Sequence, residues 1–373
     1  MKNNPLIELE NAGQGVWLDY IRRELMTSGE LKKLIDEDGL SGMTSNPTIF
    51  EKAISAGADY DAQLHDLIAQ DPQVDANILY EKIAVQDIQM AADLLFPVYQ
   101  KKNKMDGFVS LEVSPEVAED TEATMAQARH LWKMVGRPNI MIKVPATKNG
   151  IPAIEQLIAE GININITLMF TMAHYENVAQ AYIRGLQRCE KPENVSSVAS
   201  FFVSRVDTVV DKMLDEIGGE DARNLRGQAA IANSKMIYRR FLQIFEGKSF
   251  FALKEKGARV QRPLWASTST KDPSYRDVIY VEELVGKNTV NTMPPDTLKA
   301  FRDHGRVVRD AVEKGQPQEI IEDLANFDID LNDVGEKLQQ EGVGSFASSF
   351  EKLLSALKNK SKMLLAKEVH THR

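Results

Sequence analysis

Residues 140–145 read IMIKVP, a short apolar run that contains one lysine, Lys143. A nearly continuous apolar run is typical of a strand in a parallel sheet, because such a strand is buried on both faces. Similar runs alternate along the chain with longer segments of helical periodicity, which predicts α/β units with parallel strands. The expected strands are residues 16–20, 42–46, 107–113, 140–145, 162–170, 198–204, 263–268 and, for the eighth, a segment within 288–293.

Helices are expected in the gaps between these strands. Residues 30–38 carry apolar side chains at helical spacing and stop at Gly39, and residues 75–96 do the same before Pro97. The other clear amphipathic segments are 151–160, 331–340 and 345–357. With 373 residues, the chain is longer than the usual single domain, but (β/α)8 barrels with insertions often reach this length as one unit. We therefore expect a single barrel domain over residues 1–373, with helical insertions at about 51–103 and 207–261 and C-terminal helices at about 310–373.

Composition excludes several classes of protein. The chain has 45 basic and 54 acidic residues, and its net charge of −9 argues against a nucleic-acid partner. The single cysteine, Cys189, allows no internal disulfide and no cysteine cluster for zinc, which fits a reducing cytoplasm. No apolar run suits a signal peptide or a membrane helix, so we expect no membrane partner.

Polar side chains fall repeatedly within or at the end of the expected strands. In a (β/α)8 barrel the active site forms where the C-terminal ends of the strands converge. Each polar residue taken alone is equally well explained as a strand end or a helix cap, but the whole set points to a site. Its members are Asp19, Asn46, Glu112, Lys143, Asn165, Thr167 and Ser200.

Lys143 is the most unusual member of this set, since lysine is rarely buried without a partner. Burial disfavours the charged form of an amine, and a neutral amine attacks carbonyl carbon to form a Schiff base. Asp19 and Glu112 would supply the proton transfers that this chemistry needs. The alternative is a structural lysine that only pairs with Asp19 or Glu112.

A second group of residues suits an anion. Arg205 follows the sixth expected strand, where a guanidinium can hold a phosphate with two hydrogen bonds. The hydroxyls of residues 267–270 and the charge of Lys271 would assist it. Arg205 is otherwise an ordinary residue at the start of a helix. The sequence has no glycine-rich nucleotide motif, no serine-nucleophile elbow and no metal-ligand spacing, so we expect no cofactor and no metal.

Four segments of the chain resemble the transaldolase family. Residues 42–50 (GMTSNPTIF) resemble its N-terminal signature, and residues 142–170 (IKVPATKNGIPAIEQLIAEGININITLMF) resemble the segment around its Schiff-base lysine. The resemblance continues through residues 199–205 (ASFFVSR) and 264–271 (LWASTSTK). It runs from about residue 19 to residue 294, most of the chain.

The resemblance implies a fold and a reaction. It implies a class I aldolase-type (β/α)8 barrel with the Schiff-base lysine on the fourth strand. The implied enzyme belongs to the non-oxidative pentose phosphate pathway and needs no cofactor. It moves a dihydroxyacetone unit from sedoheptulose 7-phosphate or fructose 6-phosphate to glyceraldehyde 3-phosphate or erythrose 4-phosphate.

The resemblance also implies residue roles. Lys143 would form the imine, Asp19 would take the proton of the C4 hydroxyl, and Glu112 with Thr167 would position water. The implied substrate-binding residues are Asn46, Asn165, Ser200, Arg205, Ser269 and Lys271. Many members of the family have arginine where Lys271 stands, and a lysine lacks the two-pronged guanidinium.

Two other functions fit parts of the pattern. An aldolase of the same superfamily would release dihydroxyacetone instead of transferring it, but such enzymes are shorter and use a Tyr or Gln for proton transfer. An inactive sugar-phosphate binder would have lost the lysine or a carboxylate, and none is lost. Sugar phosphates are the expected partners, and the chain is expected to act as a monomer or a homodimer.

Overall fold

Eight parallel strands form a closed barrel in the computed structural model, which describes residues 4–55 and 57–371. Each strand pairs with its neighbour in sequence, and β1 pairs with β8. The predicted (β/α)8 barrel is thereby confirmed, and the last two residues of the expected C-terminal segment lie outside the described residues. The strands are β1 (Gln14–Asp19), β2 (Gly42–Thr44), β3 (Phe108–Glu112), β4 (Ile140–Pro145), β5 (Ile164–Met169), β6 (Ser197–Phe202), β7 (Arg262–Ala266) and β8 (Thr289–Met293).

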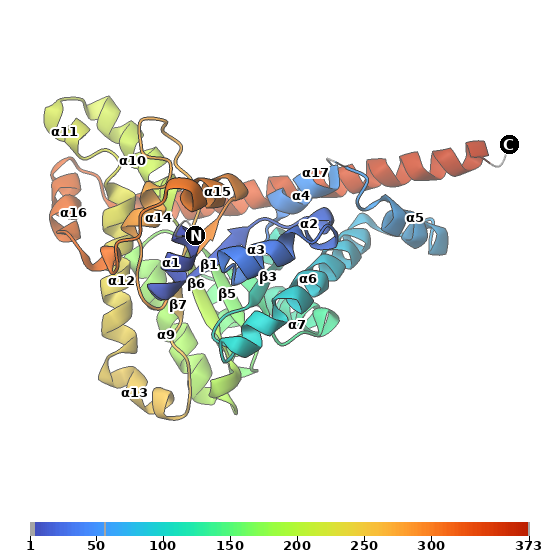
Figure 1. Cartoon of the computed structure of the whole chain (residues 1–373), viewed down its shortest axis with the longest axis horizontal. Helices are drawn as coiled ribbons and strands as arrows, with labels where there is room; N and C mark the ends of the chain where they lie inside the picture. Colours follow the sequence, from blue (N-terminus) through green and yellow to red (C-terminus); the bar gives the residue numbers. More distant parts are fainter. Residues whose placement is uncertain (1–3, 56, 372–373) are drawn as a thin grey trace.

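Helices surround the barrel and fill the two long connections (Figure 1). The first half of the chain contributes α1 (Pro5–Asn11), α2 (Arg23–Thr27), α3 (Glu30–Asp38), α4 (Pro47–Ser55), α5 (Asp61–Gln70), α6 (Ala76–Lys101), α7 (Thr121–Val135) and α8 (Gly150–Ala159). The second half contributes α9 (Met172–Arg188), α10 (Val203–Ile217), α11 (Glu220–Asn224), α12 (Ala229–Phe245), α13 (Lys248–Glu255), α14 (Ile279–Glu283), α15 (Pro295–His304), α16 (Pro317–Asn326) and α17 (Leu331–Thr371). Short 3₁₀ turns occupy Pro115–Val117, Pro192–Asn194 and Ala311–Glu313.

Helix α6 does not stop before Pro97, contrary to the sequence prediction, but continues to Lys101. Its last turn packs against the start of β3, where the ring of Tyr99 meets that of Phe108 edge to face at 5.4 Å. Proline in a helix costs a hydrogen bond and introduces a clash. Here the burial of Tyr99 and its ring contacts offset that cost. These are tertiary contacts, so the local sequence does not predict them.

The C-terminal segment also differs from the prediction, because the two expected helices are one continuous helix, α17. It crosses the molecule and extends beyond the barrel (Figure 1). Glycines along it suggest helix ends, but two of them serve as points of close packing. A Cβ at Gly335 would lie 2.1 Å from the side chain of Thr171, and one at Gly342 would lie 2.8 Å from that of Leu168. The glycines let the helix approach the end of β5.

Helix α17 holds the ends of two strands together. The buried amide of Gln339 donates to the carbonyl of Ala146, just after β4, at 3.1 Å and to that of Leu168 in β5 at 2.9 Å. Further along, the ammonium of Lys360 donates to the carbonyl of Ile54 in the last turn of α4 and to that of Gly57 beyond the helix. The helix therefore fixes β4, β5 and α4 relative to one another.

The N-terminal end of the barrel interior is filled by a polar and aromatic cluster. Asp106 accepts from the indole of Trp17 at 2.7 Å and from the hydroxyl of Ser41 at 3.0 Å, and it pairs with Arg262 at 3.4 Å. The Trp17 ring lies against Gly42, where a Cβ would come within 2.3 Å of it. This end of a barrel serves stability, so the site is sought at the other end. Among the described residues, no helix is long and apolar enough to cross a membrane.

Replacing Gln339 by leucine tests the role of α17. The change leaves the carbonyls of Ala146 and Leu168 buried without this donor, and each unsatisfied buried group costs about 1–3 kcal/mol. We expect Gln339→Leu to lower the free energy of unfolding in urea by about that amount. Gln340→Leu, at the exposed neighbouring position, is the matched control. Equal stability of the two variants would contradict a stabilising role for the hydrogen bonds of Gln339.

Candidate active site

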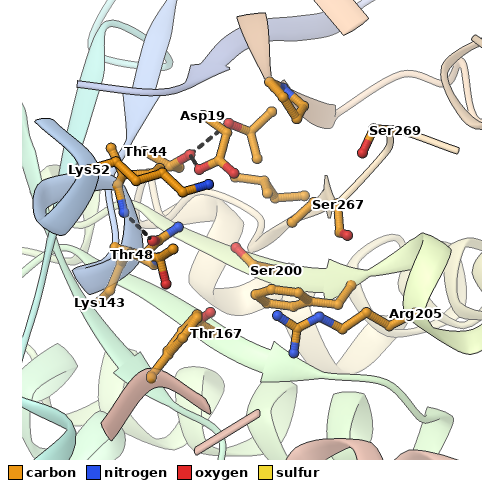
Figure 2. Close-up of a pocket in the computed structure, with 18 of the residues that line it drawn as sticks. Asp19, Thr44, Thr48, Lys52, Lys143, Thr167, Ser200, Arg205, Ser267 and Ser269 are labelled. Carbon is orange, nitrogen blue, oxygen red and sulfur yellow. Dashed lines mark hydrogen bonds between the residues drawn. The ribbon is translucent and has the colours of Figure 1, made fainter. Parts of the chain in front are cut away.

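A cavity of about 240 Å³ opens at the C-terminal ends of the strands. Its lining draws on strands from around the barrel and on α4, α10 and α17. In Figure 2, Asp19, Thr44, Lys52 and Lys143 gather on one side, and Arg205, Ser267 and Ser269 lie on the other. Eight of the residues expected from the sequence line it: Asp19, Asn46, Lys143, Thr167, Ser200, Arg205, Ser269 and Lys271.

Lys143 lies in β4 with its side chain reaching the cavity wall. The residue is 5% exposed, and its ammonium donates to the carbonyl of Ser45 at 2.9 Å and to Glu112 at 3.2 Å. The amine is thus shielded from bulk solvent and lines the cavity. Its proton has a carboxylate within hydrogen-bond distance.

Glu112 does not line this cavity, although the sequence placed it in the site. It lies behind Lys143, 8% exposed, and borders a second, smaller cavity between β3, α6, α7 and α17. Burial raises the pKa of Glu112 above its ordinary value, and the charge and hydrogen bond of Lys143 oppose that rise. The carboxyl group is thus suited to exchange protons with Lys143.

Asp19, at the end of β1, is the carboxylate that faces the cavity. It accepts a hydrogen bond of 2.6 Å from the hydroxyl of Thr44, which also hydrogen-bonds Thr292 at 2.7 Å. Burial raises the pKa of Asp19, and the positive charge of Lys143 and the Thr44 hydrogen bond lower it. This group can act as a base once it has lost its proton.

The strand β5 carries Asn165 and Thr167 in an irregular segment. Its register with β6 shifts between Ile166 and Met169, and Leu168 adopts a φ of +58°, a strained conformation for a residue other than glycine. The hydroxyl of Thr167 is buried and has no hydrogen-bond partner among the described residues. It is therefore available to a molecule in the cavity.

Asn165 lies beneath the cavity surface, not on it. It is fully buried, accepts from the hydroxyl of Ser200 at 2.6 Å and donates to that of Ser110 at 3.0 Å. Ser200 does line the cavity. Ser200, not Asn165, therefore faces the cavity, and its hydrogen bond to Asn165 fixes the direction of its hydroxyl.

Asn46 combines two roles that the sequence presented as alternatives. Its side-chain oxygen accepts from the backbone N–H of Ile49 at 3.0 Å, so it caps α4. It also lines the cavity. With the oxygen engaged by the helix, the amide nitrogen is the group that it offers to a ligand.

Two cations define the far side of the cavity. The guanidinium of Arg205, on α10, lies 5.0 Å from the ring centre of Phe202. Lys271 donates to the hydroxyl of Ser269 at 2.7 Å. Burial lowers the pKa of Lys271, and the charge of Arg205 lowers it further. Two cations close enough to affect each other suit an anion such as a phosphate.

Sequence reasoning missed three lining residues of chemical interest: Thr44, Lys52 and Phe346. Lys52 points into the cavity from α4 (Figure 2). Thr48 also lines the cavity and belongs to the segment 42–50 that resembles the family signature. Lys52 lies four residues later, on the same helix face, so this spacing could have predicted it. Phe346 comes from α17, and no local signal links that helix to the barrel mouth.

Among the described residues, no group of three or more His, Cys, Asp or Glu side chains could hold a metal.

Comparison with known proteins defines the class. The sequence profile described as Transaldolase/Fructose-6-phosphate aldolase matches residues 16–357, and the chain belongs to this family. It is 46% identical over 362 residues to a protein named Transaldolase from Mycobacterium marinum, covering 95% of this chain and 96% of the relative. It is also 44% identical over 380 residues to a protein named Transaldolase 2 from Nostoc punctiforme, covering 98% and 99%.

The raised pKa of Asp19 predicts a pH-dependent effect of Asp19→Asn on stability. The folded state holds the Asp19 proton to a higher pH than the unfolded state does, so wild type loses stability as the pH rises through that window. Asparagine has no such penalty. The free energy of unfolding of Asp19→Asn relative to wild type is therefore expected to increase between pH 4 and pH 8.

Urea unfolding at several pH values measures this difference. The control is Asp323→Asn, which changes an exposed carboxylate on α16. A difference between Asp19→Asn and wild type that stays constant with pH would contradict the assigned direction.

Proposed function

We propose that this chain is a transaldolase that acts through a Schiff base on Lys143. The observation that carries the proposal is the surroundings of that amine. Lys143 lies at the cavity wall, 3.2 Å from the buried Glu112, in a cavity that Asp19 also lines. The reaction needs an amine, a proton-transfer partner and a base at the bond to be cleaved, and these three residues supply them.

The first stage is imine formation. The neutral amine of Lys143 attacks the ketone carbon of a ketose phosphate and forms a carbinolamine. Loss of the hydroxyl as water requires a proton, for which Glu112 is the adjacent source. The buried hydroxyl of Thr167 hydrogen-bonds this water, and the same pair returns water when the imine is hydrolysed.

The second stage breaks and remakes a carbon–carbon bond. Asp19 takes the proton of the C4 hydroxyl, the C3–C4 bond breaks, and an aldose phosphate leaves. The electron pair remains on the dihydroxyacetone unit as an enamine bound to Lys143. Attack of this enamine on a second aldose phosphate forms the new bond, and Asp19 returns its proton to the new hydroxyl.

The remaining lining residues suit the polar groups of a sugar phosphate. Ser200, oriented by Asn165, and Asn46 meet hydroxyls, while Arg205, Ser269 and Lys271 meet the phosphate. The ketose donors are sedoheptulose 7-phosphate and fructose 6-phosphate, and the acceptors are glyceraldehyde 3-phosphate and erythrose 4-phosphate. This places the enzyme in the non-oxidative pentose phosphate pathway.

The proposed setting is the cytoplasm, with sugar phosphates as partners, no nucleic acid and no membrane, and a monomer or a homodimer as the working form. The net charge of −9 supports the absence of a nucleic-acid partner, and the single cysteine suits a reducing compartment.

Borohydride trapping tests the covalent step. Incubation with fructose 6-phosphate followed by reduction is expected to add a dihydroxyacetone-derived mass to the peptide containing Lys143. Lys143→Arg is expected to abolish the adduct and to lower turnover at least about a thousandfold, because arginine stays protonated and forms no imine. The matched control is Lys235→Arg, at another buried lysine, which pairs with Glu283 at 2.7 Å outside the cavity. An adduct on any other lysine would refute the assignment.

Dependence on an acceptor separates a transaldolase from an aldolase. With fructose 6-phosphate alone, we expect little free dihydroxyacetone, because the enamine stays covalently bound to Lys143 until an acceptor arrives. Addition of erythrose 4-phosphate is expected to start continuous formation of sedoheptulose 7-phosphate and glyceraldehyde 3-phosphate, both measured by mass spectrometry. Release of dihydroxyacetone at a rate that the acceptor does not change would instead assign the aldolase reaction.

A further inference from the structure

The loop that carries Ser267, Ser269 and Lys271 has no helix or strand of its own. It comprises residues 267–278 and joins β7 to α14, and we call it the β7–α14 loop. Lys271 sits where this loop borders both the main cavity and a neighbouring crevice lined by α10. The position of its ammonium therefore depends on what holds the loop.

Electrostatics alone would push this part of the loop away from the site. Lys271 lies close enough to Arg205 for the guanidinium to lower its pKa, so the two cations repel. A segment without regular hydrogen bonding yields easily to such a force. Specific contacts must hold Lys271 near Arg205 when no anion lies between them.

Helix α10 supplies these contacts through two carboxylates one turn apart. Asp211 accepts from the hydroxyl of Tyr275 in the loop at 2.7 Å and from the backbone N–H of Gly227 at 2.9 Å. Asp207 accepts from the hydroxyl of Tyr280 on α14 at 2.7 Å and from the backbone N–H of Ala230 at 2.7 Å. Asp207 and Asp211 are 1% and 7% exposed, so these hydrogen bonds are made in a low-dielectric setting.

Further contacts reinforce the same arrangement. The Tyr275 ring packs on Gly227, where a Cβ would come within 2.9 Å of it. Asp272, beside Lys271, accepts from the guanidinium of Arg226 at 2.8 Å. Arg205 is itself a residue of α10. The same helix therefore carries Arg205 and, through its two carboxylates, positions the loop that carries Lys271.

From this geometry we propose that Asp211 and Tyr275 are positioning residues for the anion subsite. They act through Lys271 and set its place relative to Arg205, which determines the affinity for the phosphate of the substrate. The proposal rests on the proposed function, because it concerns the phosphate end of the same cavity. Neither residue lines the main cavity, and both act at one remove from the ligand.

Tyr275→Phe tests the proposal, since it keeps the ring against Gly227 and removes the hydroxyl that Asp211 holds. The expected results are a rise of about fivefold in the dissociation constant of inorganic phosphate, measured by calorimetry, and a similar rise in KM for fructose 6-phosphate. Borohydride trapping with dihydroxyacetone, which has no phosphate, is expected to change by less than about twofold. Asp211→Asn removes the charge of the carboxylate that accepts this hydrogen bond, and it is expected to weaken phosphate binding as well.

A double-mutant cycle with Lys271→Met separates positioning from a general structural effect. In that background, Tyr275→Phe is expected to leave phosphate affinity unchanged, because the residue through which it acts is gone. The control is Tyr182→Phe, whose hydroxyl donates to the carbonyl of Arg259 at 2.9 Å. An equal loss of affinity with and without Lys271, or no loss in Tyr275→Phe, overturns the proposal.

Phosphate binding does not require catalysis, so the cycle also distinguishes the two hypotheses. A chain that fails the acceptor test but shows the coupling between Tyr275 and Lys271 keeps the anion subsite and loses the transaldolase assignment. A wild-type chain that binds no phosphate overturns the positioning proposal, whatever its activity.

Discussion

The register between β3, β4 and β5 places Glu112, Lys143 and Asn165 in one row across the barrel. Glu112 pairs with Lys143, and Lys143 pairs with Asn165. Because side chains alternate along a strand, a shift of one residue in any of these pairings would turn its polar group away from the others. Closure of the barrel between β1 and β8 brings Asp19 to the same end. The chemistry of the site thus depends on a backbone arrangement that the apolar core and the polar cluster around Asp106 hold in place.

Sequence reasoning succeeded where the deciding forces were local. Every residue of Ile140–Pro145 is buried, and its apolar run predicted β4 to the residue. The sequence singled out Asp19, Lys143 and Ser200 because a polar group within or ending such a run stands out, and all three line the cavity. Their meeting at one cavity follows from the barrel, in which the carboxyl ends of all strands converge.

The misses have tertiary causes. Helix α6 runs through Pro97 because Tyr99 packs on β3, and α17 is continuous because its glycines fit against Thr171 and Leu168. Phe346 reaches the cavity only because α17 crosses the barrel. It lies about 300 residues after β2 in the sequence, and local periodicity does not predict contacts over such a separation. The sequence analysis placed Glu112 and Asn165 among the site residues, yet neither lines the main cavity, because side-chain packing decides which polar groups face it.

In the proposed reaction, the proton of Lys143 presents the most demanding problem. The ammonium cannot attack a ketone, so its proton must first leave, and Lys143 is only 5% exposed to solvent. Glu112 offers a nearer acceptor, because burial raises the pKa of its carboxyl group and its oxygen lies 3.2 Å from the amine. Transfer between them converts a buried ion pair into two neutral groups, and the desolvation cost of the pair falls accordingly. Burial raises the pKa of Asp19 and the charge of Lys143 lowers it, and the protonated imine keeps a positive charge at that nitrogen while Asp19 acts as the base. The contact between Glu112 and Lys143 thus both holds the amine in the barrel and places a proton acceptor beside it.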